Sequence, residues 1–340
     1  MDILIKSYNR PYYLDRCLYS IQKHVCNNDG KIIILDDGTP QKYLDKIQEK
    51  FPLVIIKKSE FYQEKIKYTS IGKQPEKYKI PIDFWLNAAK NASDNFILIE
   101  DDTWFTDKVN LINIEEEMVE NNVMMTKLYW VGNNVINQNK EETNLKDIVL
   151  LKPKLSITIP FLYNFVFYKF DKFKIRKTLR LFKIHTDEKH LAYYTIYAVA
   201  GMIFNKNYFI SLWDNHENKI DEGLQLYNAV KKLKKTKGKL KFARYKKEVL
   251  RTGFVSSATN QHKENFEGNI DMFQFNKLLN EAWYSAEFEV INSLPNEIEE
   301  NEVVKVIQSS GKENMTPKNW ILWKNAFKQR YVSIGCKIDY

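Results

Sequence analysis

The chain has 340 residues, which is long for a single domain and predicts either one large α/β domain or a domain with a C-terminal appendage. Its composition, 44% hydrophobic and 28% charged, excludes the disordered, collagen-like and disulfide-scaffold classes of protein. The net charge of +9 is unevenly placed, because residues 152–183 contain nine Lys or Arg side chains and a single acidic one, Asp171.

The first 105 residues alternate short apolar runs with amphipathic segments. Runs rich in β-branched residues predict four buried strands, at residues 2–6, 31–35, 53–56 and 96–99. Helical spacing of apolar residues predicts one helix that begins at Pro11 and others at residues 41–50 and 82–92. This order predicts a parallel sheet with right-handed crossovers, and such sheets bind ligands at the carboxyl ends of their strands.

Beyond residue 105 the pattern is less regular. Further helices are predicted at residues 109–121, 224–233 and 270–288. Further strands are predicted at residues 124–131, 198–205 and 239–245. We therefore expect a compact core of residues 1–255, followed by a helical C-terminal extension over residues 256–340.

The three cysteines, Cys17, Cys26 and Cys336, have no C-x-x-C spacing, which argues against a disulfide framework or a structural zinc site and favours a reducing cytosol. The N-terminus enters a strand-like run without a basic leader, so no secretory signal is predicted. The longest uncharged stretch, residues 155–168, is too short to span a membrane. Together these features predict a cytoplasmic protein without a membrane span.

Polar residues follow three of the predicted strands directly, at one edge of the predicted sheet. They are Ser7-Tyr8-Asn9-Arg10, Asp36-Asp37-Gly38 and Glu100-Asp101-Asp102. Three carboxylates in a partly desolvated site repel one another, so a positive partner is expected beside them. Mg²⁺ or Mn²⁺ would use one or two of these carboxylates together with the oxygens of a diphosphate. Asp36 and Asp37 could accept hydrogen bonds from a nucleobase imide or from ribose hydroxyls.

These motifs, together with Ala89-Lys90-Asn91, resemble the GT-A glycosyltransferases of family 2 in order and spacing over the first 105 residues. The resemblance implies a mostly parallel α/β sheet flanked by helices, in which residues 1–105 bind a nucleotide sugar and residues 106–255 bind the acceptor. It implies a nucleoside-diphosphate sugar donor, a UDP-sugar before others, and a saccharide, lipid-linked or protein-linked acceptor. It also implies that the acidic triplet holds Mn²⁺ or Mg²⁺, here with Glu100 in place of the commoner aspartate.

The same resemblance assigns roles to individual residues. Those that would contact the nucleoside are Ser7, Tyr8, Asn9, Asp36 and Asp37, and those that belong to the same nucleotide-sugar-binding motifs are Arg10 and Lys90. Glu100 and Asp101 would contact the ribose or the sugar, and Asp102 would bind the metal. Gly201 is similar to a small residue that lets the backbone approach the donor sugar, although a bulge explains a glycine in a strand equally well.

Asp221 and Glu222 precede a predicted helix, much as an acidic pair does in the family. In an inverting transfer one of them would take the proton of the acceptor hydroxyl, and Glu222 aligns better with the base than Asp221 does. Acidic side chains also favour a helix N-terminus for electrostatic reasons, so both could serve the helix alone. His262 could be a late metal ligand, but an isolated His beside Asn260 and Gln261 is more often a surface residue.

Residues 152–183 interleave aromatic with basic side chains. Three interpretations remain open: a core element with a basic outer face, an acceptor-binding insertion, and an interfacial segment that docks on anionic lipid at the inner face of the membrane. A role in bacterial polysaccharide or glycoconjugate synthesis is the family-level expectation.

Two other functions compete with glycosyl transfer. A sugar nucleotidyltransferase would need a Gly-rich phosphate loop after the first strand, where this sequence has Ser7-Tyr8-Asn9-Arg10. A basic aromatic module without catalysis would bind anionic lipid or nucleic acid through residues 152–183. No nucleic-acid-binding signature accompanies that segment, so no nucleic-acid partner is expected.

Overall fold

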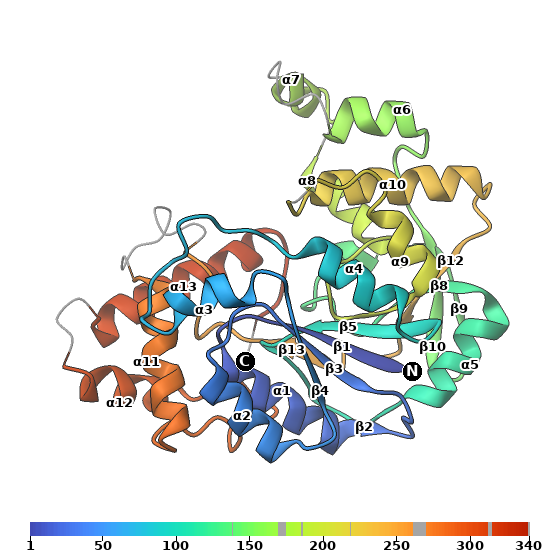
Figure 1. Cartoon of the computed structure of the whole chain (residues 1–340). Coiled ribbons are helices and arrows are strands. Elements are labelled where there is room, and N and C mark those ends of the chain that lie inside the picture. Colours follow the sequence, from blue (N-terminus) through green and yellow to red (C-terminus); the bar gives the residue numbers. More distant parts are fainter. Residues whose placement is uncertain are drawn as a thin grey trace.

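The structure is a computed structural model of the chain, and it describes residues 1–137, 139–168, 175–184, 186–217, 219–260, 270–311 and 315–338. Figure 1 shows a central twisted sheet with helices on both faces and with the last three helices gathered at one end. Within these ranges, no helix is both long enough and apolar enough to cross a lipid bilayer.

The central sheet has nine strands among the described residues. In spatial order they are β4 (Ile55–Lys58), β3 (Ile32–Asp36), β1 (Asp2–Ser7), β5 (Asn95–Glu100), β11 (Met202–Asn205), β8 (Val123–Lys127), β12 (Lys241–Tyr245), β10 (Ile148–Pro153) and β9 (Asn139–Asn144). The first four are mutually parallel, β11 is antiparallel to both of its neighbours, β8 and β12 are parallel, and β10 is antiparallel to β12 and β9. The sheet is therefore mixed, and its parallel half comes from the first 105 residues.

The predicted α/β architecture is confirmed, as are the strands predicted at residues 2–6, 31–35 and 96–99. The prediction of a buried strand at residues 53–56 is wrong in position and burial, because the strand begins at Ile55 and Leu53 is 92% exposed. β4 lies at the edge of the sheet, where only β3 pairs with it. Its apolar residues therefore do not mark a central strand.

The helices of the first half follow the strands that they connect. They are α1 (Pro11–His24), α2 (Gln41–Lys50), α3 (Tyr62–Thr69), α4 (Ile82–Lys90) and α5 (Leu111–Asn121). Pro11 suits the first turn of α1 because no intrahelical partner is needed there for a backbone N–H. The helix predicted at residues 109–121 begins two residues later, since Val109 and Asn110 form the short strand β7 beside β2 (Val25–Cys26).

The second half contains shorter helices and one long one. They are η1 (Asn134–Asn137), α6 (Pro160–Tyr163), the π-helix η2 (Asn164–Tyr168), α7 (Ile175–Leu181), α8 (Asp187–Leu191), η4 (Ala192–Thr195), α9 (Lys206–Leu212) and α10 (Glu222–Lys235). The long helix α10 confirms the helix predicted at residues 224–233, and α6 and η2 pack against it. A further small sheet pairs β6 (Thr103–Phe105) with β13 (Leu250–Thr252), which ties the segment after Asp102 to the end of the second half.

Three helices form the C-terminal part: α11 (Met272–Tyr284), α12 (Glu300–Ser309) and α13 (Pro317–Ser333). The helix predicted at residues 270–288 is confirmed as α11, whose start is fixed by the Asp271 side chain accepting from two backbone N–H groups of the first turn. Trp283 and Trp320 belong to the same hydrophobic cluster as Tyr12 and Ile3 of the first half. One core is therefore continuous across residue 255, where the sequence predicts the extension to begin.

Substitutions on α13 test whether this helix belongs to the core. Trp320 is fully buried and its indole N–H donates to the Val255 carbonyl, so Trp320→Ala should lower the free energy of unfolding by about 3–5 kcal/mol. The neighbouring Ile321→Ala, at a partly exposed position, is the matched control and should cost much less. Denaturant unfolding measures both, and equal losses would mean that α13 is not part of the core.

Candidate functional site

A cleft opens where strands β1, β3 and β5 end. Its volume is about 1030 Å³, with the open solvent at its mouth included. The register of the sheet brings the strand ends together, because Ser7 pairs with Asp36 and Lys6 pairs with Glu100. Seven of the residues expected to bind a nucleotide sugar or a metal line this cleft: Ser7, Tyr8, Arg10, Asp37, Glu100, Asp101 and Asp102.

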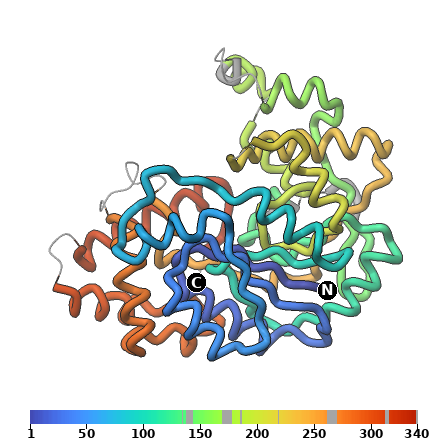
Figure 2. Tube along the Cα trace, in the orientation of Figure 1, coloured from blue at the N-terminus to red at the C-terminus, as the bar shows by residue number. Residues whose placement is uncertain are grey.

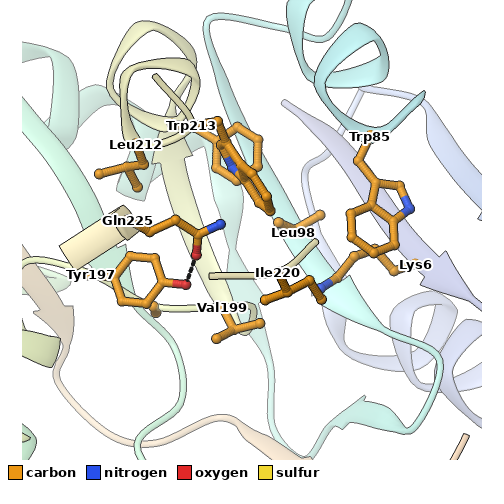
Figure 3. A pocket seen from close by; sticks show the side chains of 11 residues that line it. Lys6, Trp85, Leu98, Tyr197, Val199, Leu212, Trp213, Ile220 and Gln225 are labelled. Atoms are coloured by element: carbon orange, nitrogen blue, oxygen red, sulfur yellow. Dashed lines mark hydrogen bonds between the residues drawn. The ribbon is translucent and has the colours of Figure 1, made fainter. Parts of the chain in front are cut away.

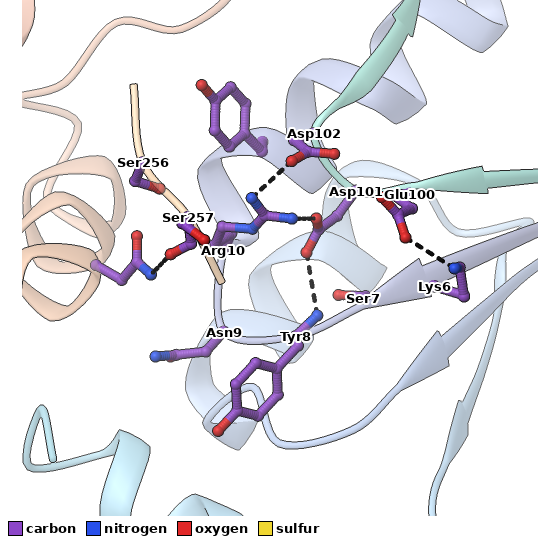
Figure 4. A network of polar contacts seen from close by, with 12 residues as sticks. Lys6, Ser7, Tyr8, Asn9, Arg10, Glu100, Asp101, Asp102, Ser256 and Ser257 are labelled. Atoms are coloured by element: carbon purple, nitrogen blue, oxygen red, sulfur yellow. Dashed lines mark hydrogen bonds and ion pairs between the residues drawn. The ribbon is translucent and has the colours of Figure 1, made fainter. Parts of the chain in front are cut away.

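Arg10 links the two aspartates that follow β5 (Figure 4). Its Nη1 donates to Asp102 Oδ2 at 2.7 Å, and its Nη2 donates to Asp101 Oδ1. The other Asp101 oxygen accepts from the Tyr8 backbone N–H at 3.0 Å. The side chains of Arg10 and Asp101 are 7% and 1% exposed, so this is a buried ion cluster. The positive partner that the carboxylates require is thus supplied, at least in part, by the chain itself.

Burial makes these carboxylates unusually basic. It raises the pKa of Asp101 to about 7, with the Arg10 charge acting in the opposite direction, and it raises the pKa of Asp102 in the same way. Asp102 Oδ1 is buried and has no hydrogen-bond partner among the described residues. A buried carboxylate oxygen without a partner is costly, so this atom is ready to receive a cation or a hydrogen-bond donor.

A divalent cation fits this arrangement only if the ligand supplies part of its coordination. Asp102 Oδ1 can provide one oxygen, and a bound diphosphate would provide others. Among the residues that the structure describes, no group of three or more His, Cys, Asp or Glu side chains could hold a metal ion. His262, the second predicted metal ligand, lies outside the described residues.

Glu100 is held by a lysine of the neighbouring strand (Figure 4). Its Oε1 lies 2.7 Å from Lys6 Nζ, and this positive charge lowers the pKa of Glu100 below its ordinary value. Lys6 Nζ also lies 5.1 Å from the centre of the Trp85 ring. Glu100 is therefore an ionised acceptor of hydrogen bonds. Sequence reasoning missed both Lys6 and Trp85, although Lys6 directly precedes the first motif.

The opposite end of the cleft combines a carboxylate with aromatic rings. Asp37 forms a buried ion pair with Lys65 and accepts from the Ser59 hydroxyl. Burial raises the pKa of Asp37 to about 6, while the Lys65 charge lowers it. The rings of Tyr8 and Tyr78 meet edge to face with their centres 5.7 Å apart, and both line the cleft beside Asp37. Aromatic faces beside a hydrogen-bond acceptor can hold a planar base.

Asp36 and Asn9 lie behind the wall of the cleft. Asp36 is fully buried, accepts from the Gly38 and Thr39 backbone N–H groups, and receives the Ser7 hydroxyl. Asn9 has a positive φ of 53° and accepts from the Asn280 amide of α11. These two side chains fix the loops that present Ser7, Tyr8 and Asp37, and the structure does not direct them into the cleft.

Gly201 and Lys90 lie in different places. Gly201 has φ 76°, and a Cβ there would come within 3.0 Å of the Tyr129 Cβ, so the backbone conformation and the close packing both require glycine. Lys90 is exposed at the last residue of α4. Lys90 lies away from the cleft because α4 leads into the start of β5, and β5 reaches the cleft only at its other end.

A second pocket joins the cleft at Glu100 and Tyr331, and it includes Gly201. Its volume is about 840 Å³, again with open solvent included. Aromatic side chains dominate its wall: Tyr129, Trp130, Tyr194, Tyr197 and Tyr331. Glu100 is the one carboxylate in that wall, and no Lys or Arg side chain is part of it among the described residues. This pocket suits an uncharged ligand with flat apolar faces.

The acidic pair Asp221 and Glu222 stands at the start of α10, and Glu222 lies beside the second pocket. Asp221 caps the helix, because its Oδ1 accepts from the Leu224 N–H and its Oδ2 accepts from the Tyr168 hydroxyl. Glu222 Oε2 accepts from the hydroxyl of Tyr194, which lines the pocket, at 2.5 Å. Glu222 is thus hydrogen-bonded to a residue of the pocket wall, whereas both oxygens of Asp221 accept hydrogen bonds from residues outside that wall.

A smaller, mostly apolar pocket lies between Trp85 and Tyr197 (Figure 3). The Tyr197 hydroxyl donates to Gln225 Oε1, as the dashed line in the figure shows. Two buried donors in its wall, Trp85 Nε1 and Gln225 Nε2, have no hydrogen-bond partner among the described residues. Lys6 and Ile220 line both this pocket and the cleft, and Tyr197 lines both this pocket and the second pocket, so the three hollows are neighbours.

The C-terminal helix completes the cleft. Phe327 and Tyr331 of α13 line it, and Tyr331 also lines the second pocket. Their spacing of four residues places both on one face of the helix. The spacing of Phe327 and Tyr331 could be read from the sequence as one helix face. The sequence did not indicate that this face contacts residues near position 100.

Comparisons with known proteins give distant structural neighbours. No protein-family model matches the sequence, and no curated protein matches it. The crystal structure of residues 1–349 of S. aureus TarS has a TM-score of 0.41 and 12% identity, over 97% of this chain and 91% of that chain. A longer S. aureus TarS structure has a TM-score of 0.38 and 11% identity, over 98% of this chain and 54% of that chain. The present chain therefore spans about half the length of that TarS chain. Mouse xyloside xylosyltransferase 1 has a TM-score of 0.31 and 10% identity, over 70% of this chain and 84% of that chain. With TM-scores this low, function is inferred from the residues of the cleft instead.

Replacing Arg10 tests the buried ion cluster. Arg10→Ala leaves Asp101 and Asp102 without their cation and should cost about 3–5 kcal/mol of stability near pH 8. The folded-state pKa of Asp101 already lies above its unfolded value, so the folded state favours the protonated acid. The stability loss should therefore be small at acidic pH and should grow as the pH rises through about 7.

Denaturant unfolding of wild type and variant across this pH range measures the effect. The matched control adds Asp101→Asn to Arg10→Ala, which removes the titrating group and should flatten the pH dependence of the loss. A loss in the single variant that is the same at every pH would contradict the ion cluster.

Proposed function

We propose that the chain is a GT-A glycosyltransferase of the family 2 type that transfers a sugar from a nucleoside-diphosphate donor to an acceptor hydroxyl. The observation that carries this proposal is the meeting of seven candidate residues in one cleft at the carboxyl ends of three parallel strands. One end of that cleft offers aromatic rings with a carboxylate, and the other offers an acidic pair with one buried, unpartnered oxygen. These ends match the base and the diphosphate of a nucleotide sugar.

The donor would lie along the cleft with its base at Tyr8, Tyr78 and Asp37. An ionised Asp37 accepts hydrogen bonds only, which favours a base with an imide N–H, as in UDP. The Arg10 guanidinium sits at the other end, where it offsets part of the negative charge of Asp101 and Asp102 beside the position assigned to the diphosphate. Mn²⁺ or Mg²⁺, held by Asp102 and the diphosphate oxygens, would supply stabilisation of the negative charge that develops on the leaving group.

The acceptor would occupy the second pocket, where a neutral saccharide can place its apolar face against Tyr194, Tyr197 or Tyr331. In the inverting reaction, the acceptor oxygen bonds to C1 of the sugar while the bond from C1 to the phosphate oxygen breaks and its electron pair leaves with the diphosphate. Glu222 takes the acceptor proton, which requires the hydroxyl to come within about 3 Å of its carboxylate. Tyr194, which donates to Glu222, sets the orientation of that carboxylate.

Asp102→Ala tests the metal-binding assignment. Wild-type protein should melt at a higher temperature with UDP and Mn²⁺ than with UDP alone, because a ligand that binds only the folded state raises its stability. The variant should weaken the Mn²⁺-dependent part of UDP binding by about tenfold or more. Asp107→Ala, which removes an exposed carboxylate paired with Lys247, is the control and should behave as wild type. An undiminished Mn²⁺ effect in Asp102→Ala would refute the assignment.

Glu222→Gln tests the base. The variant should bind UDP and Mn²⁺ as wild type does but should lose about 100-fold or more in kcat for transfer to neutral aryl glycosides, measured by mass spectrometry with a panel of UDP-sugars. Asp221→Asn is the matched control, and it should alter stability through the helix cap more than it alters kcat. Transfer by Glu222→Gln at the parental rate would assign the base to another residue.

A further inference from the structure

A short helical unit projects from the body of the molecule. It consists of Ile159, α6, η2, α7 and the described residues up to Ile184, and it lies beyond α10 at the green end of the second half (Figures 1 and 2). Its inner contacts run through η2 and α6 to α10. One side of the unit is therefore anchored, and the other side faces away from the sheet.

The side chains of this unit divide into two sets. Tyr163, Val166 and Phe167 are buried in the second hydrophobic cluster, where the rings of Tyr163 and Phe167 pack on Tyr193. The core interpretation of the segment 152–183 therefore holds for these residues, and Leu155, Ile157, Tyr168 and Leu179 pack half-buried against the same cluster. The outward set consists of large apolar residues that are exposed: Ile159, Phe161, Leu162, Leu181, Phe182 and Ile184.

The exposure in the outward set is large. Phe161 is 73% exposed, Leu181 is 79% exposed and Phe182 is 68% exposed. A single exposed leucine needs no explanation, but several large apolar side chains exposed on one small projecting unit mark an interaction surface.

Charge identifies the kind of surface that this unit fits. Residues 152–191 contain ten Lys or Arg residues and three acidic residues, which accounts for most of the net charge of the chain. Among the described side chains of this stretch, Lys154, Lys183 and Lys189 are exposed, and Lys183 stands between Phe182 and Ile184 in the chain. An apolar surface with basic residues around it is complementary to a bilayer that contains anionic lipid, where apolar groups enter the acyl boundary and cations remain at the headgroups.

We propose that this unit docks the protein on the surface of an anionic membrane. The aliphatic members of the outward set, such as Leu162 and Leu181, favour lipid over a ligand that needs flat stacking partners. The helices α6 and α7 have four and seven residues, so the unit lies on the bilayer and does not cross it. The docking proposal goes beyond the glycosyltransferase function and does not depend on that function. The docking surface lies beyond α10, away from the sheet and its cleft (Figure 1).

Vesicle co-sedimentation of the full chain tests the docking surface. Wild-type protein should bind vesicles of phosphatidylcholine with phosphatidylglycerol about tenfold more tightly than vesicles of phosphatidylcholine alone, and added salt should weaken this binding. The double variant Phe161→Ser with Phe182→Ser should bind the anionic vesicles about tenfold more weakly, since both rings lose their place in the acyl boundary. Lys154→Gln with Lys183→Gln should reduce the preference for the anionic vesicles.

The matched control is Leu53→Ser with Val119→Ser, which removes two exposed apolar side chains elsewhere on the surface and should leave vesicle binding unchanged. An unchanged melting temperature without ligand in all variants shows that the fold is intact. The proposal is wrong if wild type ignores anionic vesicles or if the control and the Phe161/Phe182 variant bind equally. It is also wrong if sedimentation velocity without lipid shows a dimer that only the Phe161/Phe182 variant dissociates, because a second copy then covers this surface.

Discussion

The buried contact of Arg10 with Asp101 and Asp102 is the interaction on which the site depends. Two carboxylates gathered at the end of a buried strand would be too costly without a cation, and the guanidinium fork satisfies one oxygen of each. Arg10 follows β1 and the aspartates follow β5, so the ion cluster also joins two adjacent strand ends. Arg10 holds the cluster together but leaves Asp102 Oδ1 without a partner among the described residues, so this oxygen can still bind a cation or a hydrogen-bond donor.

Parts of the chain that are distant in sequence line the cleft and the second pocket around this cluster. The parallel half of the sheet supplies the polar side chains, the long helix α10 presents Glu222 beside the second pocket, and α13 closes the cleft with Tyr331. The C-terminal helices therefore do more than extend the molecule. They share a core with the first half, and α13 contributes wall residues to the cleft and to the second pocket.

Much of this arrangement was predictable because strand order in an α/β sheet determines where loops gather. The three polar clusters follow from predicted strands that end at residues 6, 35 and 99, each within one residue of the strand's end in the structure. The direction of each side chain was not predictable: Asp36 turns to its own loop, whereas its neighbour Asp37 faces the cleft. Lys65 and Tyr331 were missed because their partners lie far away in sequence. The edge position of β4 also could not be read from local composition, which looks the same in central and edge strands.

The most direct measurement is a crystal structure of the protein with UDP and Mn²⁺, in which anomalous scattering locates the metal. The account predicts the base against the Tyr8 and Tyr78 rings near Asp37, and the manganese peak beside Asp102 Oδ1, while Arg10 keeps its contact with Asp101. A nucleotide bound elsewhere, or a metal peak remote from Asp102, would contradict it.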